Sequence, residues 1–269
     1  LSGKILVPFP VESAISGVMQ HYDRLWYRRT FTIPSTWGGQ NILLNFGAVD
    51  YECEVFINGQ SVGVHKGGYD PFSFDISSFL TNAGPQEITV RVYDPTSKGG
   101  QPRGKQTLEP GGIMYTCTSG IWQTVWLEPV PKTSISNIKM IPDIDKSVLN
   151  LTVSTKGSAT NQSITAVVKE GDVVVTTFEG AVNSKLQIPV PNAKLWSPDS
   201  PFLYDLSITL NSEGVGIDSL TSYFGMRKIS VGTVDGYKKL LLNNEFLFQI
   251  GPLDQGFWPD GLYTAPTDS

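Results

Sequence analysis

Short runs of alternating apolar and polar residues dominate this sequence, and they restrict the fold to β structure. In Tyr51–Ile57 (YECEVFI) every second side chain is apolar, and the two glutamates lie between them. Such a period of two is typical of a strand with one buried face. Asn58-Gly59 follows directly, and Asn-Gly is the strongest short-range signal for a hairpin turn. Helical periodicity is nearly absent, so the sequence predicts an all-β protein.

The first half of the chain predicts a β-sandwich of the jelly-roll kind. Runs like the one above recur before Pro129, at 26–33, 41–46, 86–93 and 122–127. Together they make about six to eight strands, which is enough for a sandwich or jelly roll. The two prolines in EPVPKTSI cannot continue a central strand. We therefore expect a jelly-roll domain over residues 1–131.

A second set of alternating runs predicts a smaller, immunoglobulin-like sandwich of about 100 residues. The runs are SVLNLTVST, QSITAVVKEGDVVVTTFEG, LYDLSITL and LTSYFGMRKISVG. In the first of them Leu149, Leu151 and Val153 share one face, which we expect to be buried. The Cys and Trp signature of antibody domains is absent from this pattern. We place the second domain at residues 132–233.

Residues 234–269 form a separate segment that begins with a predicted hairpin. Two short apolar runs, Lys239–Asn243 and Glu245–Ile250, meet at Asn243-Asn244. This pair tolerates the positive φ angles of a tight turn. We therefore expect a strand pair here.

The composition excludes several classes of partner. The net charge is −5 and the pI is near 5.1, so the chain lacks the basic surface that nucleic acids and acidic lipids require. No apolar run approaches the ~20 residues that span a bilayer, and we expect a soluble protein. Leu1 is not an initiator methionine and no signal peptide is present, which indicates a trimmed N-terminus. Acceptor sequons at Asn150 and Asn161 favour a secreted or periplasmic protein.

The sequence shows no recognisable metal or cofactor site. His21 and His65 are the only histidines, and neither has a His, Cys or carboxylate at metal-ligand spacing. We therefore predict no metal and no cofactor. No serine lies in a Gly-x-Ser-x-Gly nucleophile elbow. Cys53 and Cys117 are interpreted as two free or half-buried thiols, with a single bridge between them as the alternative.

Glu52 and Glu54 form the one tempting carboxylate pair. Two residues apart on a strand, their Cβ atoms lie ~6.5 to 7 Å apart, near the separations of glycosidase carboxylates. Catalysis would require one of them to be buried, so that its pKa is raised. Alternation instead puts both opposite the apolar face. We favour a solvated strand face over a catalytic pair.

The stretch Asp94–Trp122 is a long connection that is poor in strand signals. Long loops on a rigid sandwich carry binding edges or interfaces. Proteins bind sugars through hydrogen-bond donors to the hydroxyls and through aromatic rings that stack on the apolar ring faces. The candidates for these two roles in this stretch are the donors Arg103, Lys105 and Gln106 and the ring of Tyr115. The alternative, to which we give equal weight, is that this stretch forms an interface between domains and does not bind a sugar.

Five stretches resemble the N-terminal region of glycoside hydrolase family 2, which includes β-galactosidases, β-glucuronidases and β-mannosidases. They follow the family's order over nearly the whole chain: WYRRTFTIPSTW, LLNFGAVDYECEVFINGQSVGVHKGGYDPFSFDIS, SGIWQTVWLEPV, LWSPDSPFLYDLSITL and SYFGMRKISV. The resemblance implies a galactose-binding-like, sugar-binding jelly roll over 1–131 and the immunoglobulin-like sandwich over 132–233. It further implies that 234–269 is the first hairpin and strand of a (β/α)₈ barrel.

The resemblance also implies a retaining exo-glycosidase that uses two glutamates on later barrel strands. Neither glutamate falls in this chain, and a barrel cannot close from one strand. We therefore expect this chain alone to be inactive, with no catalytic residue of its own. The implied partners are a carbohydrate substrate and the missing catalytic barrel, and a homo-oligomer is left open. A free-standing carbohydrate-binding module is the alternative function.

Asp254, Gln255 and Trp258 follow the expected first barrel strand. Active sites of such barrels lie at the C-terminal ends of the strands, so this position implies sugar contacts. We expect a stacking wall from Trp258 and hydrogen bonds from Asp254, with ordinary loop packing of Trp258 as the alternative. Met114 stands where the resemblance places an acidic active-site residue of the β-galactosidases. We therefore do not extend galactose specificity to this chain.

Overall fold

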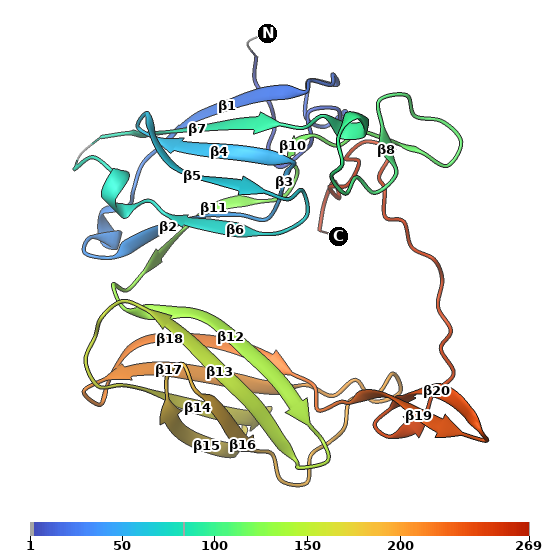
Figure 1. Ribbon diagram of the computed structural model, residues 1–269. Helices are drawn as coiled ribbons and strands as arrows, with labels where there is room; N and C mark the ends of the chain where they lie inside the picture. The colour runs from blue at the N-terminus through green and yellow to red at the C-terminus, as the bar shows by residue number, and fades with distance from the viewer. Residues whose placement is uncertain (1–2, 83, 269) are drawn as a thin grey trace. The chain divides into compact units, whose positions relative to one another are not determined.

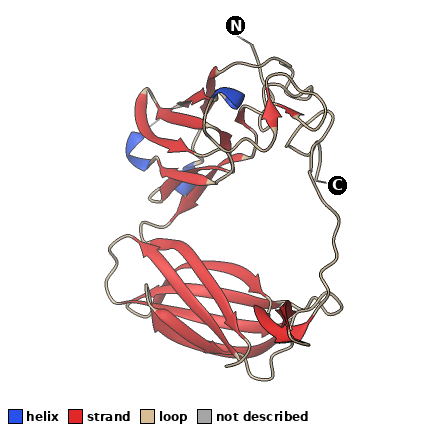
Figure 2. Cartoon of the chain, turned by 45° about the vertical axis from the view of Figure 1, so that its right-hand side comes forward, coloured by secondary structure: helices blue, strands red, loops and turns tan. Residues whose placement is uncertain are grey.

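The computed structural model describes residues 3–82 and 84–268, and the regular secondary structure within them is almost entirely β (Figures 1 and 2). The all-β prediction is confirmed. Three short 3-10 helices complete the secondary structure of the described residues: η1 (Ser35–Trp37), η2 (Ser77–Phe79) and η3 (Thr96–Lys98). None of the described helices is long and apolar enough to cross a membrane.

The chain divides into two compact units. The first unit contains the described residues up to Pro129 together with those from Leu253 onward, and the second contains Val130–Pro252. The segment 234–269 is therefore shared between the two units. Its assignment to the start of a barrel stays a prediction.

Two antiparallel sheets form the frame of the first unit (Figure 1). The four-stranded sheet has the order β1 (Arg24–Phe31), β7 (Gln86–Tyr93), β4 (Glu52–Ile57) and β5 (Gln60–Lys66). The three-stranded sheet has the order β11 (Val125–Val130), β2 (Asn41–Phe46) and β6 (Phe72–Asp75). Two further pairs are short: β3 (Val49–Asp50) with β10 (Gly120–Ile121), and β8 (Gln106–Thr107) with β9 (Tyr115–Thr116). The predicted strand at 122–127 thus begins three residues later than expected, at Val125.

Alternation along the strands decides which side chains form the core of the first unit. Val55 and Ile57 of β4 are fully buried, and so is Phe46 of β2 in the other sheet. Each such burial contributes about 1.5–3 kcal/mol to folding. Cys53 shares the inward face of β4, and both it and Cys117 are buried free thiols. This confirms the interpretation of the cysteines as unbridged.

The outward face of β4 carries the two glutamates that the sequence offered as a carboxylate pair. Glu52 forms an ion pair with Lys66 of β5 at 3.4 Å, and Glu54 forms one with Arg91 of β7 at 2.7 Å. Cross-strand ion pairs of this kind are typical of a solvated sheet face. The interpretation as a solvated face is confirmed.

The second unit is a two-sheet sandwich, as predicted (Figure 2). One sheet has the order β12 (Ser134–Asp143), β13 (Val148–Lys156) and β16 (Lys185–Pro189). The other has the order β15 (Val173–Ala181), β14 (Gln162–Glu170), β17 (Tyr204–Ser212) and β18 (Val215–Phe224). Leu149, Leu151 and Val153 of β13 all face the core, as their alternation predicted.

A three-stranded ribbon follows the second sandwich: β19 (Ile229–Val234), β20 (Tyr237–Leu242) and β21 (Glu245–Phe246). Asn243 and Asn244 both have positive φ, at 53° and 71°, and they join β20 to β21. The hairpin prediction is confirmed, but the expected extension of the second strand to Ile250 is wrong. Residues 247–250 pair with no strand among the described residues, and they are exposed, with the Leu247 carbonyl accepting a hydrogen bond from the Gln249 side chain at 3.1 Å.

Replacing Asn244 with alanine is expected to weaken the β20–β21 hairpin by roughly 1 kcal/mol, because alanine resists the left-handed conformation. Amide hydrogen exchange of β20 and β21 is the measurement. Asn244→Gly is the matched control, since both variants lose the bond from the Asn244 amide to Asp145 (2.9 Å) and only alanine opposes the φ angle. Equal acceleration of exchange in the two variants would assign the effect to the lost side-chain bond instead.

Candidate functional site at the loop-rich edge of the first unit

Three of the residues that the sequence proposed for sugar contacts lie together in the first unit. Lys105 Nζ is 3.3 Å from Gln255 Oε1, and the Tyr115 hydroxyl donates a hydrogen bond to the same oxygen. Pairing of β8 with β9 sets Lys105 and Tyr115 side by side, because the Tyr115 N–H donates to the Lys105 carbonyl at 3.0 Å. The long loop and the C-terminal segment thus meet at one place.

Five aromatic rings extend from this contact into the unit, and we call them the aromatic cluster: Tyr69, Tyr115, Trp122, Phe257 and Tyr263. The ring of Tyr115 stacks on Phe257 with centroids 4.7 Å apart, and Phe257 meets Tyr263 edge-on at 5.6 Å. The Tyr263 ring in turn lies 5.5 Å from that of Trp122. Of these rings only Tyr115 was proposed from sequence, because the others come together only through the tertiary fold.

A pocket of about 760 Å³ opens beside the aromatic cluster. Its walls include Pro8, Tyr69, Trp122, Trp126 and Tyr263. Thr264 closes one side, where its hydroxyl lies 2.6 Å from the Trp122 carbonyl oxygen. Aromatic faces with nearby hydroxyl and amide groups can stack on the apolar side of a sugar ring and hydrogen-bond its edge.

The remaining predicted residues take other positions. Gln106 is only 1% exposed, and its amide nitrogen donates to Asp50 (3.3 Å) and to the Tyr69 hydroxyl (3.2 Å). Its amide oxygen accepts the Thr118 N–H. Gln106 therefore supports the aromatic cluster from inside the unit. Arg103 donates to the Ser97 carbonyl at 3.3 Å and holds its own loop.

Asp254 and Trp258 shape the C-terminal segment. The Asp254 carboxylate accepts the Gly256 N–H at 2.9 Å, which bends the chain at that point. Trp258 exchanges two backbone hydrogen bonds with Leu262, at 2.8 and 3.0 Å. The side chain of Trp258 is 46% exposed, so part of its ring faces solvent.

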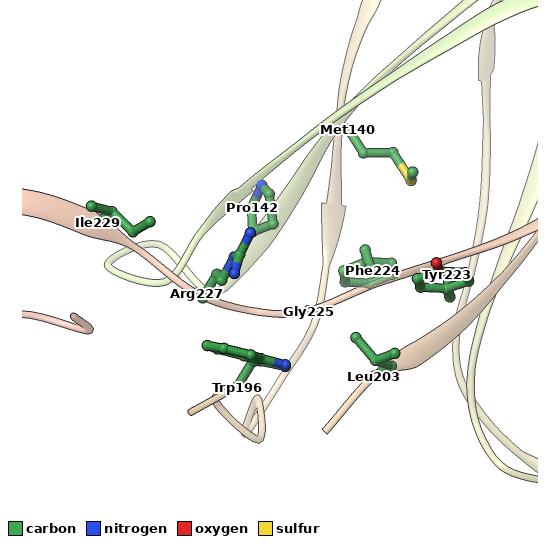
Figure 3. Close-up of a pocket in the computed structure, with 9 residues that line it drawn as sticks. All are labelled: Met140, Pro142, Trp196, Leu203, Tyr223, Phe224, Gly225, Arg227 and Ile229. Carbon is green, nitrogen blue, oxygen red and sulfur yellow. The ribbon is translucent and has the colours of Figure 1, made fainter. Parts of the chain in front are cut away.

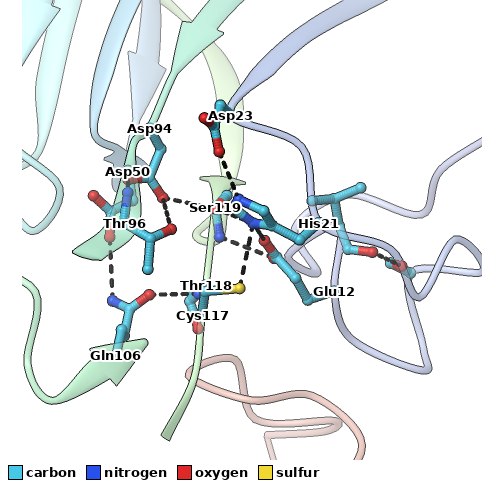
Figure 4. Close-up of polar contacts among 12 residues, drawn as sticks. Glu12, His21, Asp23, Asp50, Asp94, Thr96, Gln106, Cys117, Thr118 and Ser119 are labelled. Atoms are coloured by element: carbon cyan, nitrogen blue, oxygen red, sulfur yellow. Dashed lines mark hydrogen bonds and ion pairs between the residues drawn. The ribbon is translucent and has the colours of Figure 1, made fainter. Parts of the chain in front are cut away.

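Two buried carboxylates, Asp50 and Asp94, belong to the polar network drawn in Figure 4, and Gln106 links Asp50 to Tyr69 of the aromatic cluster. Asp50 of β3 is 3% exposed, and burial, together with the nearby charge of Asp94, raises its pKa to about 7. Burial also raises the pKa of Asp94, which accepts hydrogen bonds from the Ser119 hydroxyl (2.6 Å) and the Thr96 N–H (2.7 Å). Neither residue could be singled out from the sequence, because an aspartate at a strand end is most often exposed.

A mixed cluster of Glu12, His21 and Cys117 lies next to these carboxylates (Figure 4). His21 Nδ1 is 2.9 Å from Glu12 Oε1 and 3.3 Å from Cys117 Sγ. Hydrogen bonds to Cys117 and then to Glu12 raise the pKa of His21 to about 11, while burial raises the pKa of the Cys117 thiol. This cluster could not be recognised from ligand spacing, because 96 residues separate His21 from Cys117.

The second unit has a smaller pocket of about 480 Å³ (Figure 3). It is lined mainly by apolar side chains, and the Arg227 guanidinium lies over the Trp196 ring at 5.0 Å. None of the residues proposed from sequence for sugar contacts lines this pocket or the pocket of the first unit. We place the candidate functional site in the first unit because Lys105, Tyr115 and Gln255 meet there.

Both units match known protein families. Residues 4–131 match the sequence model of "Glycosyl hydrolases family 2, sugar binding domain", and residues 133–227 match that of "Glycosyl hydrolases family 2". A β-galactosidase of Thermoanaerobacter pseudethanolicus is 31% identical over 90% of this chain and 34% of its own length. A β-glucuronidase of Paenibacillus borealis is 24% identical over 90% of this chain and 43% of its own.

The fold agrees with these sequence matches. The β-glucuronidase of Ruminococcus gnavus in complex with D-glucaro 1,5-lactone superposes with a TM-score of 0.75 at 21% identity, over 91% of this chain and 43% of that one. The chain thus spans about a third of this β-galactosidase and somewhat less than half of these two β-glucuronidases. Two consecutive family matches over residues 4–227 and the shared fold lead to one conclusion: this chain belongs to glycoside hydrolase family 2.

Proposed function

We propose that this chain is the non-catalytic N-terminal part of a larger retaining exo-glycosidase that hydrolyses O-glycosidic bonds of carbohydrates. The observation that carries the proposal is the succession of two family 2 domains in a chain that spans 34% of the matched β-galactosidase and 43% of the matched β-glucuronidases. The names of these relatives support a β-glycoside as the substrate. A catalytic barrel is then the expected partner.

The carboxylates of this chain support a catalytic site outside it. A retaining glycosidase needs an acid/base and a nucleophile with carboxyl groups about 5–5.5 Å apart, on either side of a sugar. Glu52 and Glu54 are engaged with cations of neighbouring strands. Asp50 and Asp94 are each at most 3% exposed and bonded inside the first unit. We therefore propose that both catalytic glutamates belong to the partner barrel.

We propose further that the loop-rich edge of the first unit contributes one wall of the sugar site. The exposed ring of Trp258 and the Lys105–Gln255–Tyr115 contact support this proposal, since they combine a stacking surface with hydrogen-bonding groups. In this arrangement the first unit orients the substrate, and the barrel performs the chemistry.

The native polypeptide of the source should be purified with an antibody to residues 3–230 and sized under denaturing conditions. We expect a mass well above the 29.4 kDa of this chain, with turnover of at least one chromogenic β-galactoside, β-glucuronide or β-mannoside. The 269-residue chain itself should turn over none of them. A native mass equal to that of this chain, without turnover, would contradict the proposal and favour a free-standing carbohydrate-binding module.

In the complete enzyme, replacing Trp258 with alanine is expected to lower kcat/KM about fivefold to tenfold, which corresponds to the ~1 kcal/mol of a lost aromatic stacking contact. Steady-state kinetics on the substrate identified above is the measurement. Trp26→Ala is the matched control, because Trp26 is also exposed but lies on β1, stacked on Phe56. Equal kinetics of the Trp258 variant and the unmodified enzyme would remove Trp258 from the sugar site.

A further inference from the structure

Three side chains that commonly bind metals converge where the N-terminal arm (residues 3–23) meets the segment before β10. Their ligand atoms, from Glu12, His21 and Cys117, all lie within 4.8 Å of one another. Figure 4 shows the His21 ring between the carboxylates of Glu12 and Asp23, with the Cys117 sulfur directed at it. We propose that Glu12, His21 and Cys117 bind one Zn²⁺ ion, which fastens the N-terminal arm to the sandwich.

The orientation of the ligands supports this assignment. Metal-binding histidines almost always donate their second ring N–H to a carboxylate or carbonyl, which fixes the ring and its tautomer. His21 Nε2 lies 3.0 Å from Asp23 Oδ1, so Nδ1 is the nitrogen that faces Glu12 and Cys117. The second oxygen of Glu12 accepts the Ser119 N–H at 3.0 Å. Two of the three ligands are thus held in place before any ion arrives.

The charges around the cluster call for a cation at this position. Glu12 has a side chain only 4% exposed, and the buried Asp94 is linked to the same segment through Ser119. A carboxylate oxygen and a ring nitrogen 2.9 Å apart are both acceptors unless a proton or a metal ion lies between them. A divalent ion would take the place of that proton and neutralise more of the buried negative charge.

The donor set selects the metal. One sulfur, one nitrogen and one oxygen suit Zn²⁺, whereas Ca²⁺ and Mg²⁺ prefer oxygen ligands alone. Zinc bonds of about 2.0–2.3 Å in a tetrahedron separate the ligand atoms by roughly 3.3–3.6 Å. Glu12 Oε1 and Cys117 Sγ lie 2.9 and 3.3 Å from His21 Nδ1. These ligand atoms would therefore have to move apart only slightly to bind the ion. The Ser119 hydroxyl, 3.5 Å from Nδ1, or a water molecule would complete the tetrahedron.

The experiment uses the 269-residue chain after dialysis against a chelator. Co²⁺ serves as a spectroscopic substitute for Zn²⁺, and we expect one equivalent to produce a thiolate-to-cobalt charge-transfer band that Zn²⁺ abolishes by competition. Cys117→Ser should eliminate the band, and Asp23→Asn should weaken binding about 10- to 100-fold through loss of the ring's orientation. Cys53→Ser is the matched control, because Cys53 is equally buried but belongs to β4, and it should retain the band.

Two results would overturn the proposal: no charge-transfer band in the unmodified chain, or an equal band in the Cys117 variant. If a variant does not fold, a second test can be made on the unmodified protein. Zn²⁺ should slow alkylation of Cys117 at least tenfold in mild denaturant, whereas alkylation of Cys53 should be slowed less. Equal rates for Cys117 with and without Zn²⁺ would also reject the site.

Discussion

Replacing Asp50 with asparagine is expected to stabilise the first unit at pH 8 and to reduce the dependence of its stability on pH between about 4 and 7, leaving the part that comes from Asp94, whose pKa burial also raises. Burial raises the pKa of Asp50 to about 7 in the folded chain, from an ordinary value of 3.8. Between these values the folded state holds a proton that the unfolded state has released. The free energy of unfolding must therefore fall as pH rises through this window, and the loss is complete above pH 7.

The size of the effect follows from the same two pKa values. About three units correspond to roughly 4 kcal/mol at most, because each unit is worth 1.36 kcal/mol. Asparagine removes the charge and keeps an oxygen that can accept the hydrogen bond from Gln106. It should therefore retain the stability that the protonated aspartic acid provides at pH 4 and hold it at pH 8.

Urea unfolding followed by tryptophan fluorescence is the measurement. All the tryptophans except Trp196 lie in the first unit, so the fluorescence reports mainly on the unfolding of that unit. Asp70→Asn is the matched control, because Asp70 is an exposed aspartate of the same unit, and its profile should follow that of the unmodified chain. If Asp50→Asn changed stability equally at every pH, the pKa of Asp50 would be the same in the folded and unfolded states, and our account of its burial would be wrong.

Replacing Gly120 with alanine is expected to destabilise the first unit by about 3 kcal/mol, from two separate causes. Gly120 has φ of +80°, a conformation that costs an L-residue roughly 1–2 kcal/mol. A methyl group there would also collide with the Tyr27 hydroxyl and lie 3.0 Å from Tyr27 Cζ and 3.1 Å from Leu25 Cδ1. Forcing such a contact in a packed interior costs a further 1–3 kcal/mol or so.

Two comparisons separate these causes. Gly112 also has positive φ, at 58°, but no atom lies within 4 Å of the position its methyl group would take, so Gly112→Ala should cost only about 1 kcal/mol. Combining Gly120→Ala with Tyr27→Phe should recover part of the lost stability. The double variant lacks the tyrosine hydroxyl that the new methyl group would meet, but it keeps the unfavourable φ angle at position 120. Strict additivity of the two substitutions in urea unfolding would contradict a direct collision.

The strands and their inward faces could be predicted from sequence because both depend on local alternation. The run Asn41–Phe46 coincides with β2, and Gln86–Tyr93 coincides with β7. The turn at Asn243-Asn244 was likewise predicted from residue type. The wrong extension to Ile250 has a tertiary cause, because an apolar run forms a strand only where another strand is available to pair with it.

The candidate site was predicted only in part, and for the same reason. Lys105 and Tyr115 could be proposed from their loop, and Gln255 from its place after the hairpin, but nothing in the sequence indicated that the three would touch. That contact joins residues 140 and 150 positions apart. The burial of Gln106 could not be predicted from the sequence either, because it depends on contacts with Asp50 and Tyr69, which are distant in the chain.

The sequence by itself determined that the chain is all-β and which side chains of β4 and β13 face the core, and its motifs indicated the family. Alternation and turn residues act over a few positions, so they can be read without the fold. The tertiary structure decided which distant side chains share one environment, and it alone assembled the aromatic cluster, buried Asp50 and brought His21 to Cys117. Burial and proximity set the charge and chemistry of these groups, and both are properties of the packed unit rather than of any local stretch of chain.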